Sequence, residues 1–187
     1  MPASTKEIAV FGSSATRPGS AEWEDAVRCG RLIAEAGLAV VTGGYCGVME
    51  AASLGAAGAG GHVVGVISAS VFPSRLGPNP HIAELVEAAS LTQRIHLLLD
   101  RASAVIALPG SLGTFAELVA AWNDAYVAPL SGRRPQPIVA VGGTWRKAVE
   151  AVAAQLAAPA ELIHFVDSVD EAVAAVVRAM RPFGAPP

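Results

Sequence analysis

The chain has 187 residues, of which 52% are hydrophobic and 16% are charged, and its formal net charge is −3 at pH 7. This length suits one domain with a large core, and the apolar composition argues against disorder. The slightly negative charge argues against a general affinity for nucleic acid or anionic lipid, so we expect no nucleic-acid partner and no membrane partner.

Targeting signals and metal-binding motifs are not recognisable in the sequence. Lys6 and Glu7 precede only a short apolar run, which does not resemble a signal peptide. No apolar run approaches the roughly 18 residues that a membrane-spanning helix needs. The two cysteines, Cys29 and Cys46, lack the spacing of a zinc site or a disulfide framework. We therefore expect a cytoplasmic protein with no metal and no bound cofactor.

Short apolar runs alternate with helical patterns along the chain. We expect strands at residues 8–11, 38–42, 62–67, 84–88, 104–108, 138–141 and 162–166. We expect helices at about residues 20–36, 48–57, 91–101, 114–126, 142–159 and 168–180, with Ser20 and Ser168 as N-caps of the first and last. This alternation predicts right-handed βαβ units, and hence an α/β fold with an open parallel sheet and helices on both faces. Residues 1–187 are expected to form one domain with a loose tail at 181–187.

An anion-binding turn is predicted between the strand at 104–108 and the helix expected to begin at Thr114. Pro109 and Gly110 end the strand, and Gly113 gives the backbone a second flexible point. Free backbone N–H groups and the helix dipole attract an anion at such a helix N-terminus. The candidate phosphate-binding residues are Gly110, Ser111, Leu112, Gly113 and Thr114.

Other glycine-bearing turns follow the strands that end at Phe11, Thr42 and Val141. The carboxyl ends of parallel strands share one edge of the sheet, where such folds place their ligands. We add to the candidate nucleotide site Ser13, Gly43, Gly44 and Gly47. Residues 12–17 do not fit the G-x-G-x-x-G fingerprint, which disfavours NAD or FAD held in the usual way.

These motifs resemble those of the LOG (Lonely Guy) family. Residues 109–117, PGSLGTFAE, match the family's P-G-G-x-G-T-x-x-E hallmark at every defined position except Ser111. Arg94 precedes Glu117 at the spacing of the family's arginine, but Ile95 replaces the lysine that usually follows it. Residues 42–49, TGGYCGVM, are similar to the family's G-G-G-x-x-G-L-M turn. The resemblance covers about residues 8–141.

The resemblance implies a Rossmann-like homodimer that binds a nucleotide. The best-known members hydrolyse the N-glycosidic bond of cytokinin nucleoside 5′-monophosphates, giving the free base and ribose 5-phosphate. In this sequence the resemblance assigns the catalytic roles to Arg94 and Glu117. A carboxylate can stabilise the oxocarbenium-like transition state of that reaction or activate water. A guanidinium can either orient that carboxylate or bind the sugar and phosphate.

Two alternatives to this hypothesis stay open at the level of sequence. Thr114 and Glu117 also fit a capping box, in which Thr114 is the N-cap and Glu117 needs no catalytic role. Ser111 and Ile95 depart from the family pattern, and a serine would be strained if its position required a positive φ. These departures favour a nucleotide- or cofactor-binding carrier or sensor without turnover.

A pyridoxal-phosphate lysine decarboxylase, a label often given to such sequences, is disfavoured by the lysine content. That chemistry needs a lysine that forms a Schiff base with the cofactor. Lys6 and Lys147 are the only lysines of the chain, and neither lies in a recognisable cofactor motif.

Overall fold

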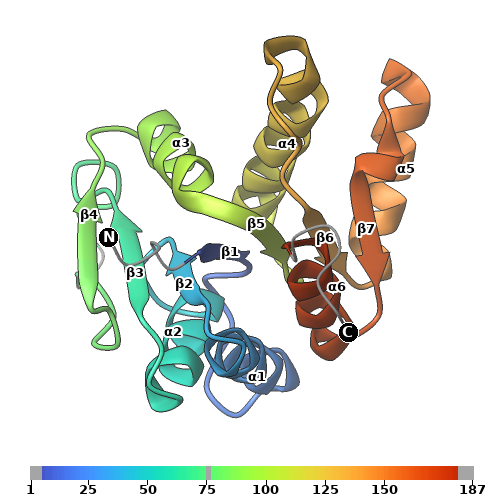
Figure 1. The fold of residues 1–187 in the computed structure, drawn as a ribbon. Coiled ribbons are helices and arrows are strands. Elements are labelled where there is room, and N and C mark those ends of the chain that lie inside the picture. The colour runs from blue at the N-terminus through green and yellow to red at the C-terminus, as the bar shows by residue number, and fades with distance from the viewer. Residues whose placement is uncertain (1–5, 75–76, 181–187) are drawn as a thin grey trace.

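Figure 1 shows the computed structural model, which describes residues 6–74 and 77–180. The tail predicted at 181–187 lies outside the described residues. The strands are β1 Glu7–Phe11, β2 Ala39–Thr42, β3 Val63–Ile67, β4 Glu84–Glu87, β5 Ala102–Ala107, β6 Ile138–Val141 and β7 Ile163–Val166. The helices are α1 Ala21–Glu35, α2 Val48–Gly58, α3 Leu91–Arg101, α4 Leu112–Val127, α5 Gly143–Leu156 and α6 Val169–Met180, with short 3-10 helices η1 Ala128–Ser131 and η2 Ala160–Leu162.

The strands form one parallel sheet with the order β4-β3-β2-β1-β5-β6-β7. Helices α1, α2 and α6 cover one face and α3, α4 and α5 cover the other (Figure 1). The central strands are buried on both faces, which explains why their sequences are continuous apolar runs rather than alternating ones. The predicted α/β fold, with its open parallel sheet and helices on both faces, is confirmed.

Helices α1 and α2 pack closely because glycine stands at their contact points. A Cβ built on Gly30 would lie 1.9 Å from the carbonyl oxygen of Ala52, and a Cβ on Gly55 would lie 1.9 Å from that of Val27. Any side chain at either position would therefore push the two helices apart. This contact holds α2, and the glycine turn that precedes it, against the sheet.

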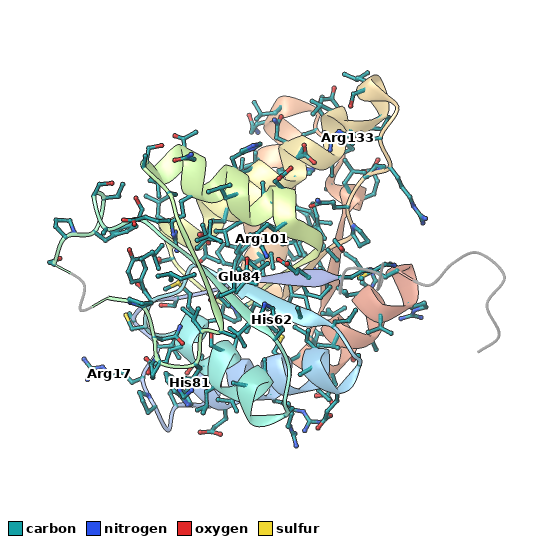
Figure 2. All side chains as sticks on the ribbon, turned by 60° about the vertical axis from the view of Figure 1, so that its left-hand side comes forward. Arg17, His62, His81, Glu84, Arg101 and Arg133 are labelled. Carbon is teal, nitrogen blue, oxygen red and sulfur yellow. The ribbon has the colours of Figure 1, made fainter. Side chains whose placement is uncertain are left out.

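Ion pairs join the start of the edge strand β4 to the start of β1, and Figure 2 labels three side chains of this network: Arg101, Glu84 and His62. Arg101 at the end of α3 lies 2.7 Å from Glu7 and 2.9 Å from Glu84, measured between side-chain nitrogen and oxygen atoms. His62 Nε2 lies 3.2 Å from the same Glu84 carboxylate. Since β1 and β4 begin at Glu7 and Glu84, this network stands at the amino ends of the strands, away from the edge where ligands are expected.

The predicted N-caps of the first and last helices are confirmed. Ser20 Oγ accepts a hydrogen bond from the Trp23 amide at 3.2 Å. Ser168 Oγ accepts one from the Glu171 amide at 3.3 Å, and the Glu171 side chain accepts one from the Asp167 amide at 3.1 Å. The two serine bonds cap amides in the first turns of their helices, and the Glu171 bond ties the residue before the cap to the last helix.

Helix α4 begins at Leu112, and the predicted start at Thr114 is wrong. Ser111 is the N-cap residue, with φ −111° and ψ −165°, and its carbonyl accepts a hydrogen bond from the Phe115 amide at 2.9 Å. The extended backbone of Ser111 lets the helix begin at once, so Thr114 lies inside it. The alternative of a capping box, with Thr114 as N-cap, is therefore excluded. Ser111 does not need a positive φ, so the serine is unstrained here.

The direction of the chain reverses between β1 and β5, which are neighbours in the sheet. From β1 the chain builds β2, β3 and β4 on one side, and it then returns through α3 to place β5 on the other side. The loops after β1 and β5 therefore diverge and leave a crevice at the carboxyl ends of these strands. The candidate site lies there.

Candidate functional site

A cleft of about 280 Å³ opens at the point where the strand order reverses. Its walls come from the loop after β1, the turn before α2, the irregular segment after β3, and the facing sides of α3 and α4. The lining residues are Val10, Phe11, Gly12, Ser14, Gly43, Met49, Phe72, Leu91, Arg94, Ile95, Ser111, Gly113, Thr114, Ala116 and Glu117.

Arg94 and Glu117 face each other across this cleft, from α3 and α4 respectively. Arg94 Nη1 lies 3.4 Å from Glu117 Oε1, and only 5% of Arg94 is exposed to solvent. Its Nε donates to the carbonyl of Val66 at 2.8 Å, and its Nη2 donates to the carbonyl of Gly43 at 2.9 Å. The guanidinium is thus held by β3 and by the turn after β2 while it points at the carboxylate.

The pocket around this guanidinium is shaped by a glycine and by apolar side chains. A Cβ built on Gly43 would lie 1.7 Å from Arg94 Nη2, so any side chain there would displace the guanidinium. The rings of Tyr45 and Phe72 each lie with their centroids 5.7 Å from Arg94 Cζ. Attraction between the cation and these ring faces offsets part of the loss of hydration. Gly43 is therefore a site residue because of the space that it leaves.

Glu117 is largely buried, and burial raises the pKa of its carboxyl group from 4.5 to about 7, with the Arg94 charge opposing part of the rise. Removal from water disfavours a charged carboxylate, whereas the nearby guanidinium favours it. Near neutral pH the group therefore exchanges readily between its protonated and ionised forms. A pKa near the working pH is the value that suits a general acid or base.

The turn between β5 and α4 presents the first amides of a helix to the cleft. Leu112, Gly113 and Thr114 are the first three residues of α4, so their N–H groups have no acceptor within the helix. Gly110 is required by packing, since a Cβ there would lie 2.2 Å from Thr114 Oγ1. Among the five residues predicted for this turn, Ser111, Gly113 and Thr114 line the cleft, and Gly110 and Leu112 do not.

Ser13, Gly44 and Gly47 do not line the cleft, although each was predicted to belong to the site. Ser13 Oγ accepts a hydrogen bond from the Ala15 amide at 3.1 Å, and its carbonyl accepts one from Val48 at 2.9 Å. Gly44 and Gly47 have φ of 78° and 72°, which residues with a Cβ rarely adopt. These three residues shape the turns that bring neighbouring groups to the cleft.

Two lining residues, Phe72 and Leu91, were not indicated by any sequence motif, whereas Met49 belongs to the turn of residues 42–49. Phe72 reaches the site because the segment after β3 folds back over the turn that contains Tyr45. The Tyr45 hydroxyl accepts a hydrogen bond from the Ser68 amide at 2.9 Å, and Asn79 Nδ2 donates to the Tyr45 carbonyl at 3.1 Å. An aromatic residue in a proline-rich loop was the only signal in the sequence, and it was too weak to place Phe72.

Within residues 6–74 and 77–180, no group of three or more His, Cys, Asp or Glu side chains is arranged to hold a metal ion. No helix in this part of the chain is both long and apolar enough to cross a membrane.

A family comparison identifies the group to which the chain belongs. Residues 5–173 match the model of the SLOG cluster4 family. The chain is a member of this family. Among curated relatives, a cytokinin riboside 5′-monophosphate phosphoribohydrolase of Mycobacterium tuberculosis is 36% identical over 136 residues, or 72% of this chain and 69% of that protein. The protein of the same name from Mycobacterium marinum is 36% identical over 122 residues, or 64% of each chain. The resemblance to the LOG family is thereby confirmed, over about two thirds of the length of these relatives.

Solved structures support the same fold. The molybdenum cofactor binding protein of Rippkaea orientalis superposes with a TM-score of 0.74 over 95% of this chain and 98% of that chain. The two sequences are 21% identical. This likeness concerns the fold and not the ligand.

Proposed function

We propose that this SLOG protein hydrolyses the N-glycosidic bond of a nucleoside 5′-monophosphate, releasing the free base and ribose 5-phosphate. The observation that carries the proposal is the Arg94–Glu117 pair, which lies in the cleft beside the N-terminus of α4. The mycobacterial relatives, which are named as cytokinin riboside 5′-monophosphate phosphoribohydrolases, support a substrate of that class.

In this proposal the 5′-phosphate binds at the start of α4. The amides of Leu112, Gly113 and Thr114 have no helical acceptor and lie where the helix dipole is positive. Ser111 and Thr114 add hydroxyl groups at the wall of the cleft. The ribose then extends from this turn toward Glu117, which lies one helical turn beyond Thr114.

Glu117 acts on the sugar in this mechanism. As the bond between C1′ and the base nitrogen breaks, its electron pair leaves with the base and positive charge develops on the sugar. The ionised carboxylate stabilises that charge and takes a proton from the water whose oxygen joins C1′. The departing base takes its proton from solvent. A well-placed acid or base of this kind contributes roughly 10²- to 10⁴-fold in rate.

Arg94 serves mainly to orient Glu117. Its Nε and Nη2 are directed at the carbonyls of Val66 and Gly43, and its Nη1 is directed at the carboxylate. The guanidinium therefore fixes the position of Glu117 and favours the ionised form that the reaction needs. Of the two roles that the sequence allowed for Arg94, this geometry supports orientation over phosphate binding.

Binding without turnover is the alternative function, and Ile95 is the observation that favours it. This apolar side chain lines the cleft at the position where the LOG family usually carries a lysine. A missing positive charge weakens the stabilisation of a transition state that carries phosphate. A carrier or sensor would need the binding turn but not that charge.

Incubation with AMP and with N6-isopentenyl-AMP, followed by chromatography of the free base, tests the proposal. We expect base release by the wild-type protein, a loss of at least about 100-fold in Glu117→Gln, and little change in Glu50→Gln. Glu50 is the matched control because it lies on α2 and does not line the cleft. Tight nucleotide binding with no base release would refute hydrolysis and leave the carrier function.

We also propose, from the length and composition of the sequence, that residues 1–187 form one cytoplasmic domain, and, from the family resemblance, that the protein is a homodimer. Exposed apolar side chains on α4, η1 and α5 support the second point: Tyr126, Leu130 and Leu156. Light scattering after size-exclusion chromatography should give twice the chain mass, and Leu156→Glu should lower it. A monomer at all concentrations would refute the dimer.

A further inference from the structure

A buried tryptophan on α5 contacts the strand that leads into the phosphate-binding turn. Trp145 is the third residue of α5 and is almost fully buried. Its indole Nε1–H donates a hydrogen bond to the carbonyl of Leu108 at 3.0 Å. Leu108 is the residue between the end of β5 and Pro109, so this bond is made at the point where the strand becomes the turn.

The Leu108 carbonyl is available to Trp145 because the pairing of β1 with β5 becomes irregular there. The Leu108 amide still donates to the Phe11 carbonyl at 2.9 Å, as expected for parallel strands. The next amide along the first strand, that of Ser13, donates instead to Pro109 at 3.3 Å. The indole therefore satisfies a buried carbonyl that the sheet does not, and a buried carbonyl without a donor is unfavourable.

The same indole also contacts the helix that follows the turn. The ring of Trp145 is stacked on that of Phe115, with centroids 6.0 Å apart and an angle of 4° between the ring planes. Phe115 lies in α4 immediately after Thr114 and two residues before Glu117. One side chain thus touches the residue before the turn and the helix after it.

The glycine turn before α5 explains how Trp145 reaches the carbonyl of Leu108. Gly142 is the N-cap residue of α5, with φ 93° and ψ 154°, a conformation that residues with a Cβ rarely adopt. Neither Gly142 nor Gly143 lines the cleft. The turn after β6, which the sequence placed at the ligand edge, thus serves the site indirectly by directing the first turn of α5 toward Leu108.

We infer that Trp145 is a positioning residue, which fixes the turn of residues 109–114 and the first turn of α4 from both ends. Its role in ligand binding rests on the proposed function, whereas its role in holding the turn does not. Small displacements of binding groups have large effects on ligand binding and catalysis. Loss of the indole N–H should therefore weaken the phosphate site before it affects Arg94, whose guanidinium is held by the carbonyls of Val66 and Gly43.

Two matched variants test this inference, Trp145→Phe and Trp122→Phe. Trp122 is equally buried, and its indole also donates to a backbone carbonyl at 3.0 Å, that of Pro159. Each variant loses one indole hydrogen bond of the same length, buried for Trp145 and partly buried for Trp122, so both should lose global stability. Hydrogen exchange is measured at the Leu108 and Phe115 amides, which donate to Phe11 and Ser111. We expect exchange about tenfold faster in Trp145→Phe than in Trp122→Phe; equal rates in the two variants would overturn the inference.

Binding and kinetics provide a second measurement. In Trp145→Phe we expect the Kd for ribose 5-phosphate and the KM for AMP to rise about tenfold, with a smaller change in kcat; Trp122→Phe should change neither. A fall in kcat with unchanged KM and Kd would contradict a role at the phosphate turn. If the wild-type protein releases no base, the proposed function fails, and the hydrogen-exchange comparison still decides the role of Trp145.

Discussion

The buried carboxyl group of Glu117 makes a quantitative prediction about how stability depends on pH. Burial raises its pKa from 4.5 to about 7 in the folded protein. Because the folded pKa is the higher one, folding disfavours the ionised form. The contribution of Glu117 to stability is therefore fully present below pH 4.5 and is lost as the pH rises through about 7.

The size of the effect follows from the same two values. At 1.36 kcal/mol for each pKa unit, a rise from 4.5 to about 7 corresponds to roughly 3 kcal/mol between pH 4 and pH 8. Glu117→Gln removes the titration and keeps an oxygen that can accept from Arg94. Relative to this variant, the wild-type protein should lose roughly 3 kcal/mol of unfolding free energy over that pH range.

Urea denaturation at several pH values, followed by tryptophan fluorescence, measures this difference. All other titrating groups are shared by the two proteins, so their contributions cancel in the comparison. A constant offset between the two curves from pH 4 to pH 8 would refute the reasoning, since it would mean that the carboxyl group does not titrate near 7. A widening advantage of the wild-type protein at high pH would mean that the Arg94 charge outweighs burial.

Three other predictions concern single side chains. Gly43→Ala should displace the Arg94 guanidinium, with a loss of about 2 kcal/mol in the unfolding free energy and of most base-releasing activity. Ser111→Gly should change the unfolding free energy by only a few tenths of a kcal/mol, measured by urea denaturation, because Ser111 already has an unstrained backbone. A thiol reagent should modify one cysteine in the native protein, measured by mass spectrometry: Cys46 is exposed, whereas burial raises the pKa of Cys29 to about 12.

The fold could be predicted because short apolar runs alternate with helical patterns along an apolar chain. Strands that are buried on both faces must be continuous apolar runs. In the helices between them, apolar residues recur with the spacing of a helical turn. The expected strand at 138–141 and the expected helix at 91–101 agree with β6 and α3. The strand order could not be predicted, because it depends on which side of β1 each βαβ unit packs. Only the structure shows that β5 lies beside β1.

Parts of the candidate site that are formed by a backbone motif could be predicted, and parts that are formed by a side chain from a distant segment could not. The turn after β5 and the turn after β2 are recognisable because each needs glycine for a close contact or for a positive φ. Phe72 and Trp145 act through contacts between segments far apart in the chain. Nothing local to either residue indicates that contact, so sequence patterns alone do not reveal it.

The start of α4 also decides between the two interpretations of Glu117. In a capping box Glu117 would be the third helical residue, exposed at the helix N-terminus, and the helix dipole would lower its pKa. Because α4 begins at Leu112, Glu117 instead lies in the second turn, facing Arg94 and removed from water. Its pKa is raised rather than lowered. The direction of this shift, which burial causes, therefore separates a structural cap from a carboxyl group suited to acid–base chemistry.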